Sequence, residues 1–264
     1  MTDSSRTNHY ALPAISRRFV PVWQRNFLVW RKLAVASVLG NLVDPMIMLF
    51  GLGYGLGGVM SGGGESYFSF LAAGFVASAT MYAASFEAMF SAFSRMHGQK
   101  TWDAILNAPM DLDDVVTGEL AWAASKGLLS GVAILVVAVV FGYAPVAGAV
   151  AAVPAAMLIG LTFASLALTM NALAQGYDFF SYYMTLVLTP MMMLSGVFFP
   201  VAQLPAAVQA AAAVLPLYHG VALVRPIVGG SLPPDWIVHA GVLVAYAAAG
   251  FYVALVLTRR RLLS

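Results

Sequence analysis

The sequence predicts an all-α integral membrane protein with six transmembrane helices, an N-terminal amphipathic helix at the membrane surface and a re-entrant outer hairpin between the fifth and sixth helices. The first observation is composition: 61% of the 264 residues are hydrophobic, 9% are charged, and the mean hydropathy is +0.85. Soluble domains are about half apolar and about a quarter charged. The other two observations are a set of long apolar runs and a one-sided placement of Lys and Arg.

The long apolar runs predict where the chain crosses the membrane. A spanning helix needs about 20 mostly apolar residues to cross a hydrocarbon core about 30 Å thick. Six runs fit this requirement: residues 33–56, 68–93, 120–143, 150–173, 183–199 and 237–257. The fifth run is short and contains Pro190.

Residues 200–230, between the fifth and sixth runs, are apolar but contain Pro205, Pro216 and Pro226. Broken helices at membrane depth are tolerated where protein or water covers the backbone. We therefore expect a helical hairpin that enters the outer leaflet and returns. A seventh crossing is the alternative.

Basic residues predict the orientation. With six spans, both termini share one side with the loops near residues 94–119 and 174–182. These segments and the adjoining helix ends hold every Lys and Arg except Arg225, whereas the loops at 57–67 and 143–148 hold none. Cytoplasmic loops are enriched in Lys and Arg. We expect a multi-pass protein of the bacterial inner membrane with both termini in the cytoplasm.

The chain has no fixed-period repeat and no low-complexity linker, which predicts one domain over residues 1–264. It comprises an N-terminal segment (1–32), a membrane domain (33–258) and a cytoplasmic tail (259–264). Within residues 13–32, one helical face is mainly apolar or aromatic, and it consists of Phe19, Val22, Trp23, Asn26, Phe27 and Trp30. Such a helix suits the headgroup layer. A simple positively charged topology anchor is the alternative.

Several chemistries are excluded by missing motifs. The sequence contains no G-x-x-x-x-G-K-[ST], H-E-x-x-H or G-x-S-x-G pattern. Cys is absent and the four His residues are scattered over both sides, so we expect neither catalytic residues nor a metal site. A net charge of +2 is too small to suggest nucleic acid. If ATP drives this protein, a separate chain binds the ATP.

The first cytoplasmic loop has its own predicted structure. Residues 101–106 read as a short helix that Pro109 ends, and Asp111, Asp113 or Asp114 is suited to cap the helix that follows. A short helix with a Trp and charged residues on the cytoplasmic side suits docking of a partner subunit. An ordinary interfacial turn is the alternative.

Four segments carry a family resemblance. They are residues 22–45, residues 98–104 (Gly-Gln-Lys-Thr-Trp-Asp-Ala), residues 194–205 (Leu-Ser-Gly-Val-Phe-Phe-Pro-Val-Ala-Gln-Leu-Pro) and residues 223–227, followed by the Arg-Arg-Arg-Leu-Leu tail. In this order, over nearly the whole chain, they resemble an ABC-2 type permease of the nodulation protein J family. The departures fall in loops, notably residues 60–65.

The resemblance implies a six-helix permease that pairs with itself and with two copies of a cytoplasmic ABC ATPase, which binds ATP and Mg. It also implies that the N-terminal helix and the first cytoplasmic loop touch that ATPase. The coupling residues it implies are Gln99, Lys100, Thr101, Trp102, Asp103, Ile105, Leu106 and Asn107. Family members export lipooligosaccharides, which suggests a lipid-linked or amphipathic glycan as substrate. Efflux of drugs or small amphiphiles is the alternative.

Two acidic residues lie within predicted spans and are candidates for gating or for the substrate pathway. Asp44 directly precedes Pro45, which frees a backbone carbonyl one turn earlier. We expect this pair to brace a helix kink at the dimer interface, with substrate contact as the alternative. Glu87 is expected near the cytoplasmic face in an interfacial role.

The remaining pathway candidates lie at opposite ends of the membrane. Tyr177, Tyr182 and Tyr183 open the fifth span at headgroup depth, where an aromatic belt is common. A stacking surface for a glycolipid is the alternative. Arg225 is expected to anchor the outer hairpin, with contact to an anionic substrate as the alternative.

Two rival functions remain at this point. A secondary transporter could move protons through Asp44 and Glu87, but the sequence suggests no membrane-embedded basic or His partner for either acid. A lipid-modifying enzyme is disfavoured by the absence of a catalytic motif.

Overall fold

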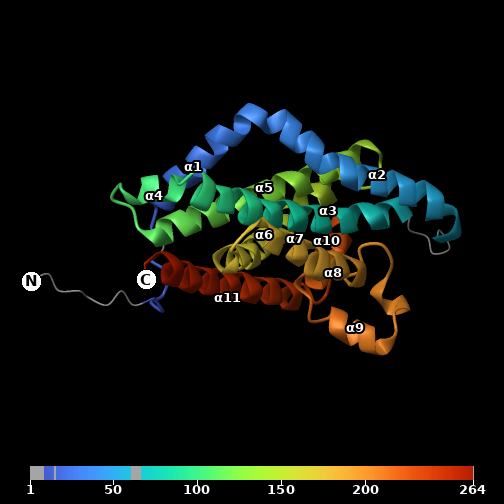
Figure 1. The fold of residues 1–264 in the computed structure, drawn as a ribbon. Helices are drawn as coiled ribbons and strands as arrows, with labels where there is room; N and C mark the ends of the chain where they lie inside the picture. The colour runs from blue at the N-terminus through green and yellow to red at the C-terminus, as the bar shows by residue number, and fades with distance from the viewer. Residues whose placement is uncertain (1–8, 15, 61–66, 264) are drawn as a thin grey trace, which may run out of the picture.

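The computed structural model describes residues 9–14, 16–60 and 67–263, and helix is the regular secondary structure throughout that part of the chain. Five long helices or helical runs are apolar enough to span a membrane: Phe19–Gly57, Tyr67–Gly98, Leu112–Val140, Val146–Leu173 and Trp236–Leu262. The described part of the chain thus has the predicted all-helical membrane fold. The C-terminus lies at the same end of the bundle as α1 and α4 (Figure 1).

The first run contains α1 (Phe19–Trp30), a 3-10 turn and α2 (Ala34–Met60). The second contains α3 (Tyr67–Phe86) and two π-helical segments, Glu87–Ser91 and Ser94–Gly98. The short α4 (Thr101–Leu106) precedes α5 (Leu112–Val140) and α6 (Val146–Leu173). The predicted short helix and the predicted cap are both confirmed, because Asp111 and Asp114 form a capping box at the start of α5.

The fifth predicted span differs most from the structure. Instead of one helix over 183–199, the chain forms α7 (Tyr177–Tyr183), a π-helical segment (Met184–Leu188) and α8 (Thr189–Leu194). The helix ends before Gly196, whose φ of +79° belongs to the left-handed region that favours glycine. The predicted bounds are therefore wrong at both ends, and this stretch is not among the five long apolar helices.

The outer segment forms two helices, α9 (Ala206–Ala212) and α10 (Pro216–Val228), before α11 (Trp236–Leu262) returns along the bundle. α9 and α10 meet at an angle of 88°. Both lie toward the end opposite the C-terminus (Figure 1). This bend is what a hairpin requires, and its entry into the outer leaflet stays a prediction.

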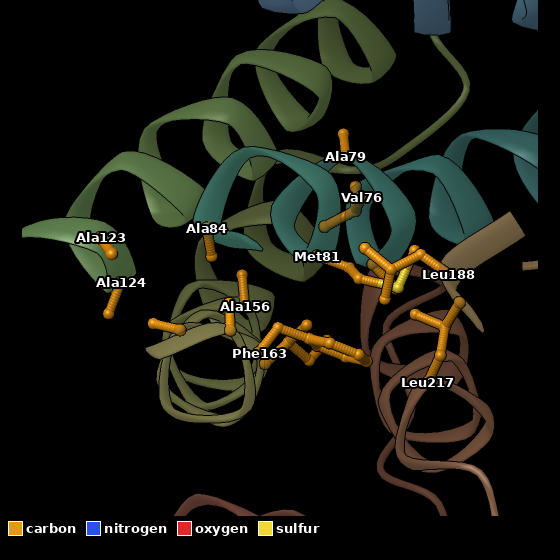
Figure 2. Close-up of a cluster of buried hydrophobic side chains, with 14 of the residues drawn as sticks. Val76, Ala79, Met81, Ala84, Ala123, Ala124, Ala156, Phe163, Leu188 and Leu217 are labelled. Atoms are coloured by element: carbon orange, nitrogen blue, oxygen red, sulfur yellow. The ribbon is translucent and has the colours of Figure 1, made fainter. Parts of the chain in front are cut away.

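The core lies between α3, α5 and α6, and α6 also packs against α10 and α11. Small residues allow close approach, as expected in membranes, where packing rather than hydrophobic burial holds helices together. A Cβ at Gly160 would lie 2.9 Å from the Ala124 carbonyl oxygen. Figure 2 shows Ala84, Ala124 and Ala156 in this core beside Phe163.

α1 and α2 lie on one side of this core (Figure 1). The predicted face of α1 is buried or half-buried, but it packs on α5 rather than facing lipid headgroups. The opposite side of α1 exposes Val20, Leu28 and Val29 beside basic residues. α2 contacts α3 and α5, yet most of its large apolar side chains are exposed.

Candidate functional site

The predicted coupling segment is attached to the bundle through one buried side chain. Trp102 is 1% exposed, and its Nε1 donates a hydrogen bond to Glu119 Oε1 on α5 at 3.2 Å. Lys100, with φ +49°, sets the turn into α4. Arg25 of α1 donates to Thr101 Oγ1 at 3.3 Å. α4 is therefore tied to both α5 and α1.

The other predicted coupling residues divide by exposure. Ile105 and Leu106 are half-buried against the core. The exposed set is Gln99, Lys100, Asp103 and Asn107. A docked partner can reach this exposed set directly, whereas Trp102 faces inward and holds α4 in place.

Beneath α4 lies a charge network that joins α3 to α5. Arg95 Nε donates to both carboxylate oxygens of Glu119, at 2.9 and 3.1 Å, and Arg95 Nη1 lies 2.9 Å from Glu87 Oε1. Lys126 Nζ lies 3.5 Å from Glu87 Oε2, and Trp122 Nε1 donates to Glu87 Oε1 at 2.8 Å. Two acids and two bases balance each other in a largely buried cluster.

The expectation for Glu87 is corrected by this network. Glu87 was expected to have no basic partner, but it is 5% exposed and paired with Arg95 and Lys126. Its depth near the cytoplasmic face stays a prediction. The sequence reasoning missed the other four members of the network: Arg95, Glu119, Trp122 and Lys126. A signal was present, because Glu119, Trp122 and Lys126 follow i, i+3, i+7 spacing and share one face of a helix.

The π-helical segment at Glu87 has its own support from α6. Asn171 Nδ2 donates to the carbonyl oxygens of Ala88 and Met89, at 3.0 and 3.2 Å. A π-bulge disturbs the regular backbone pairing and is frequent at functional sites. The amide of Asn171 satisfies carbonyls at this irregular turn, which holds the Glu87 backbone in place.

α1 and α2 join the same region of α5. Trp23 Nε1 donates to Ser125 Oγ at 3.1 Å, and the rings of Trp23, Phe27 and Trp30 surround Trp122 with centroid separations of 5.8–6.4 Å. Lys126 Nζ donates to Ser37 Oγ of α2 at 3.1 Å. The network thus contacts α1, α2, α3, α4 and α5.

A second feature is an open hollow of about 370 Å³ between α2, α3, α5 and α8. Asp44 and Pro45 line it from α2, together with Ser78 and Tyr82 of α3 and Ser130 of α5. Asp44 is exposed, and among the described residues it has no hydrogen-bond or ion-pair partner. The carboxyl therefore faces a space that is open for a ligand or another chain.

The structure does not bring the aromatic candidates together as one surface. Tyr177 packs edge-on against Phe93 with ring centroids 5.2 Å apart, and it is 48% exposed. Tyr182 is 65% exposed, whereas Tyr183 is half-buried against the core. The exposed position of Tyr182 is compatible with a place in an aromatic belt at the membrane surface.

Arg225 lies at a joint between three elements. Its Nη2 donates to the Gly196 carbonyl at 2.6 Å, and its guanidinium lies 3.7 Å from the centroid of the Phe70 ring. These contacts join α10 to α3 and to the turn after α8. This arrangement favours the predicted anchoring role over contact with a substrate.

Two His residues that were expected to be scattered are in contact. His219 Nδ1 lies 2.9 Å from His239 Nδ1, and His219 Nε2 lies 2.9 Å from the Ala213 carbonyl oxygen. Because a carbonyl only accepts, His219 Nε2 carries a proton, and in the neutral form of His219 its Nδ1 accepts from His239. The pair fastens α10 to α11. No group of three metal-ligating side chains occurs in the described residues.

Long apolar helices, with the short α4 hydrogen-bonded to a buried charge cluster, define a multi-pass membrane protein. A family model described as ABC-2 type transporter matches residues 17–228. The chain therefore belongs to the ABC-2 type transporter family, whose members are membrane subunits of transporters that work with an ABC ATPase.

Curated relatives are similar in sequence to this chain over nearly its full length. Nodulation protein J of Rhizobium leguminosarum bv. trifolii is 50% identical over 255 residues, covering 96% of this chain and 97% of the relative. Nodulation protein J of Rhizobium meliloti is 49% identical over the same length and coverage. The protein of that name from Bradyrhizobium diazoefficiens is 47% identical over 253 residues, covering 96% and 97%. Together with the family and the long apolar helices, this similarity identifies the chain as a multi-pass protein of the bacterial inner membrane.

Proposed function

We propose that this chain is the transmembrane permease subunit of an ABC exporter that moves a lipid-linked or amphipathic glycan outward. A separate ATPase subunit, present in two copies, binds ATP and Mg, and two copies of this chain form the path. Both termini and α4 lie on the cytoplasmic side. The observation that carries the proposal is the direct attachment of α4 to the Glu87–Arg95–Glu119 network inside the membrane bundle.

The network supports a mechanical route for coupling. When the partner ATPases close on ATP, they push on the exposed residues of α4 and on α1. Trp102 passes that displacement to Glu119, and the bidentate Arg95 passes it to Glu87 in the π-helical segment that follows α3. Bidentate guanidinium–carboxylate pairs have a fixed geometry, so they transmit displacement better than a single flexible contact.

The structure gives a physical reason to prefer ATP-driven export over proton coupling. A proton carrier must release and accept a proton at its acid, but Arg95 and Lys126 already neutralise Glu87. Of the two acids that a proton-driven transporter would use, Asp44 and Glu87, this leaves Asp44 alone as a proton carrier. An efflux permease for drugs or small amphiphiles uses the same architecture and differs only in substrate.

Transport by the purified components tests the proposal. The chain and its co-purifying ATPase are reconstituted into vesicles, and movement of a labelled lipo-chitooligosaccharide is followed with ATP, without ATP, and with a pH gradient alone. We expect movement only with ATP and both subunits. Movement by this chain alone in a pH gradient contradicts the proposal and favours the proton-driven alternative. Movement of a cationic dye but not of the glycolipid favours drug efflux.

A further inference from the structure

The basic tail of the chain folds as the last turn of α11, and one of its arginines pairs with α5. Arg259 Nε and Nη2 donate to the two carboxylate oxygens of Asp113, near the start of α5, at 2.9 and 2.5 Å. Arg259 is 7% exposed and Asp113 is 6% exposed. A bidentate guanidinium–carboxylate pair sets both the distance and the relative orientation of its partners. The ion pair therefore fixes the end of α11 against the start of α5.

A segment that precedes α1 covers this ion pair. Residues 9–14 form this segment, which we call the N-terminal strap. Arg259 Nη1 donates to two carbonyl oxygens of the strap, at 3.3 and 2.5 Å, and the Ala14 N–H donates to Asp113 Oδ2 at 2.8 Å. The strap thus uses the Nη1 donors, whereas the carboxylate uses Nε and Nη2. Three segments of the chain meet at one pair of charges.

The same turn of α11 is bonded to the end of α6. Arg261 Nη1 donates to the carbonyl oxygens of Asn171 and Ala172, both at 3.1 Å. The last carbonyls of a helix lack partners within that helix, and a basic side chain can satisfy them. The Asn171 side chain in turn donates to two carbonyl oxygens in the π-helical segment that contains Glu87. The end of α11 is therefore connected, through α6, to that segment.

The start of α5 also lies directly after the predicted coupling helix, α4. The C-terminus, α1 and α4 share one end of the bundle (Figure 1). Arg18 Nη1 donates to the Pro109 carbonyl oxygen, between α4 and α5, at 3.1 Å, and Ser16 Oγ donates to Asp114 Oδ1 at 2.6 Å. The chain around the start of α1 thus holds the connection between α4 and α5 as well as the ion pair.

α6 and α11 are joined by more than packing. The hydroxyls of Thr162 and Thr169 on α6 donate to the carbonyl oxygens of Leu243 and Gly250 on α11, each at 3.0 Å. α5 meets α6 through the small residues described above, and packed helices can slide past one another by small shear movements. The ion pair opposes such sliding at one end, because it fixes the start of α5 relative to the end of α11.

We propose that Arg259, Asp113 and Arg261, together with the N-terminal strap, form a clasp that makes α6 and α11 move with α4 and α5 when the partner ATPases bind ATP. Arg259 and Asp113 are then positioning residues, which act by holding two parts of the bundle together. This inference rests on the proposed function and adds a second route for the displacement, beside the Trp102–Glu119 contact. A topology anchor is the alternative role for the tail, since adjacent basic residues hold a helix end in the cytoplasm.

Two neighbouring arginines distinguish a clasp from a topology anchor. Arg259→Gln and Arg260→Gln each remove one positive charge from the same turn, but Arg260 is exposed and lies over the Tyr10 ring. Amide hydrogen exchange of the purified chain in lipid nanodiscs reports local opening. We expect exchange at the Ala14 amide to rise about tenfold or more in Arg259→Gln, because the strap loses two hydrogen bonds to a charged group. Exchange in Arg260→Gln is expected to equal that of the wild type.

Arg259→Lys is the second variant, because it keeps the charge of the tail and loses the bidentate geometry. The clasp predicts faster exchange at the Ala14 amide in this protein as well. Wild-type exchange in Arg259→Lys, whether or not Arg259→Gln inserts and folds, overturns the clasp and assigns the tail to topology. Equal exchange in Arg259→Gln and Arg260→Gln overturns it too.

A distance measurement tests whether α4 and α11 move together. Because the chain has no Cys, Ala108→Cys after α4 and Leu263→Cys after α11 place two spin labels at exposed positions. An excess of the natural chain gives dimers with one labelled copy. In the complex with the co-purifying ATPase, we expect the same distance between the labels with and without ATP. With Arg259→Gln added, the distance is expected to change when ATP binds.

The outcomes of the distance measurement decide the proposal. A distance that changes with ATP in the otherwise wild-type chain overturns it, as does an unchanged distance when Arg259→Gln is added. The expected distances in a complex that moves no glycolipid leave the clasp standing and refute the export function. Export by the wild-type complex, with exchange at the Ala14 amide equal in both glutamine variants, does the opposite.

Discussion

Arg95 holds two carboxylates that come from different helices. It pairs with Glu87 of the α3 run and with Glu119 of α5 while about 10% of its side chain is exposed. Removing one partner of a buried ion pair is more damaging than the pair is stabilising, because the remaining charge is left uncompensated. Sequence reasoning could place Glu87 in a span, but the identity of its partners depends on which helices pack together.

Replacing Arg95 therefore has a graded effect on stability. Arg95→Met leaves Glu87 with Lys126 and removes the ion-pair partner of Glu119, and it is expected to lower the free energy of unfolding by about 3–5 kcal/mol. Arg95→Lys keeps the charge but loses the bidentate geometry, so its cost is smaller. Thermal unfolding of the purified protein in detergent measures both.

The matched control is Arg31→Met, which changes an exposed residue of the turn between α1 and α2. The thermal unfolding midpoint of this control should equal that of the wild type. An Arg95→Met protein as stable as the control would show that the network contributes nothing to the fold.

At the scale of the elements, close helix packing depends on particular glycines. A Cβ at Gly74 of α3 would lie 2.6 Å from the Val197 carbonyl oxygen, in the turn that follows α8. A Cβ at Gly51 of α2 would meet nothing within 4 Å. The two glycines look alike in sequence and differ only in what packs against them.

Gly74→Ala is expected to separate α3 from the turn after α8 and to cost about 1–3 kcal/mol, the usual range for overpacking. Gly51→Ala should be neutral or stabilising by up to about 1 kcal/mol, because alanine favours helix. Denaturation of both variants in the same detergent measures the difference. Equal stabilities would contradict the close approach at Gly74.

Sequence reasoning succeeded for the long elements and failed for the irregular ones. Four of the six apolar runs became single long helices because about 20 apolar residues suffice to predict a span. The stretch around Pro190 could not be bounded, because its helix begins at Tyr177, before the apolar run, and ends before Gly196, whose φ is positive. The apolar face of α1 could be read from the sequence, but its contact with α5 depends on tertiary packing around Trp122.

For the whole molecule, topology is the feature on which coupling depends. The natural absence of Cys allows single thiols to be placed without background. Ala108→Cys follows α4, and Ser231→Cys lies between α10 and α11; both positions are exposed. In intact spheroplasts, a membrane-impermeant maleimide is expected to label Ser231→Cys at once and Ala108→Cys only after permeabilisation.

The opposite labelling pattern would place α4 outside the cytoplasm and remove its access to an ATPase. Labelling of both thiols in intact cells would contradict an odd number of crossings between them. Unmodified protein, which has no thiol, is the control for non-specific reaction.

The central claim is that ATP hydrolysed by another chain drives transport through this one by way of α4. Trp102→Ala with Asp103→Ala tests α4 as a whole, but Trp102 also anchors the helix. Charge reversal on the exposed face, Asp103→Lys with Asn107→Lys, leaves the anchor in place.

The most direct measurement is the amount of glycolipid moved per ATP hydrolysed by the reconstituted complex. For the Asp103→Lys, Asn107→Lys protein we expect the amount of glycolipid moved per ATP to fall about tenfold or more, since misplaced charges at an interface cost several kcal/mol. ATP hydrolysis continues, and the unfolding midpoint matches that of the wild type. If both this protein and the Trp102→Ala, Asp103→Ala protein move as much glycolipid per ATP as the wild type, coupling through α4 is contradicted.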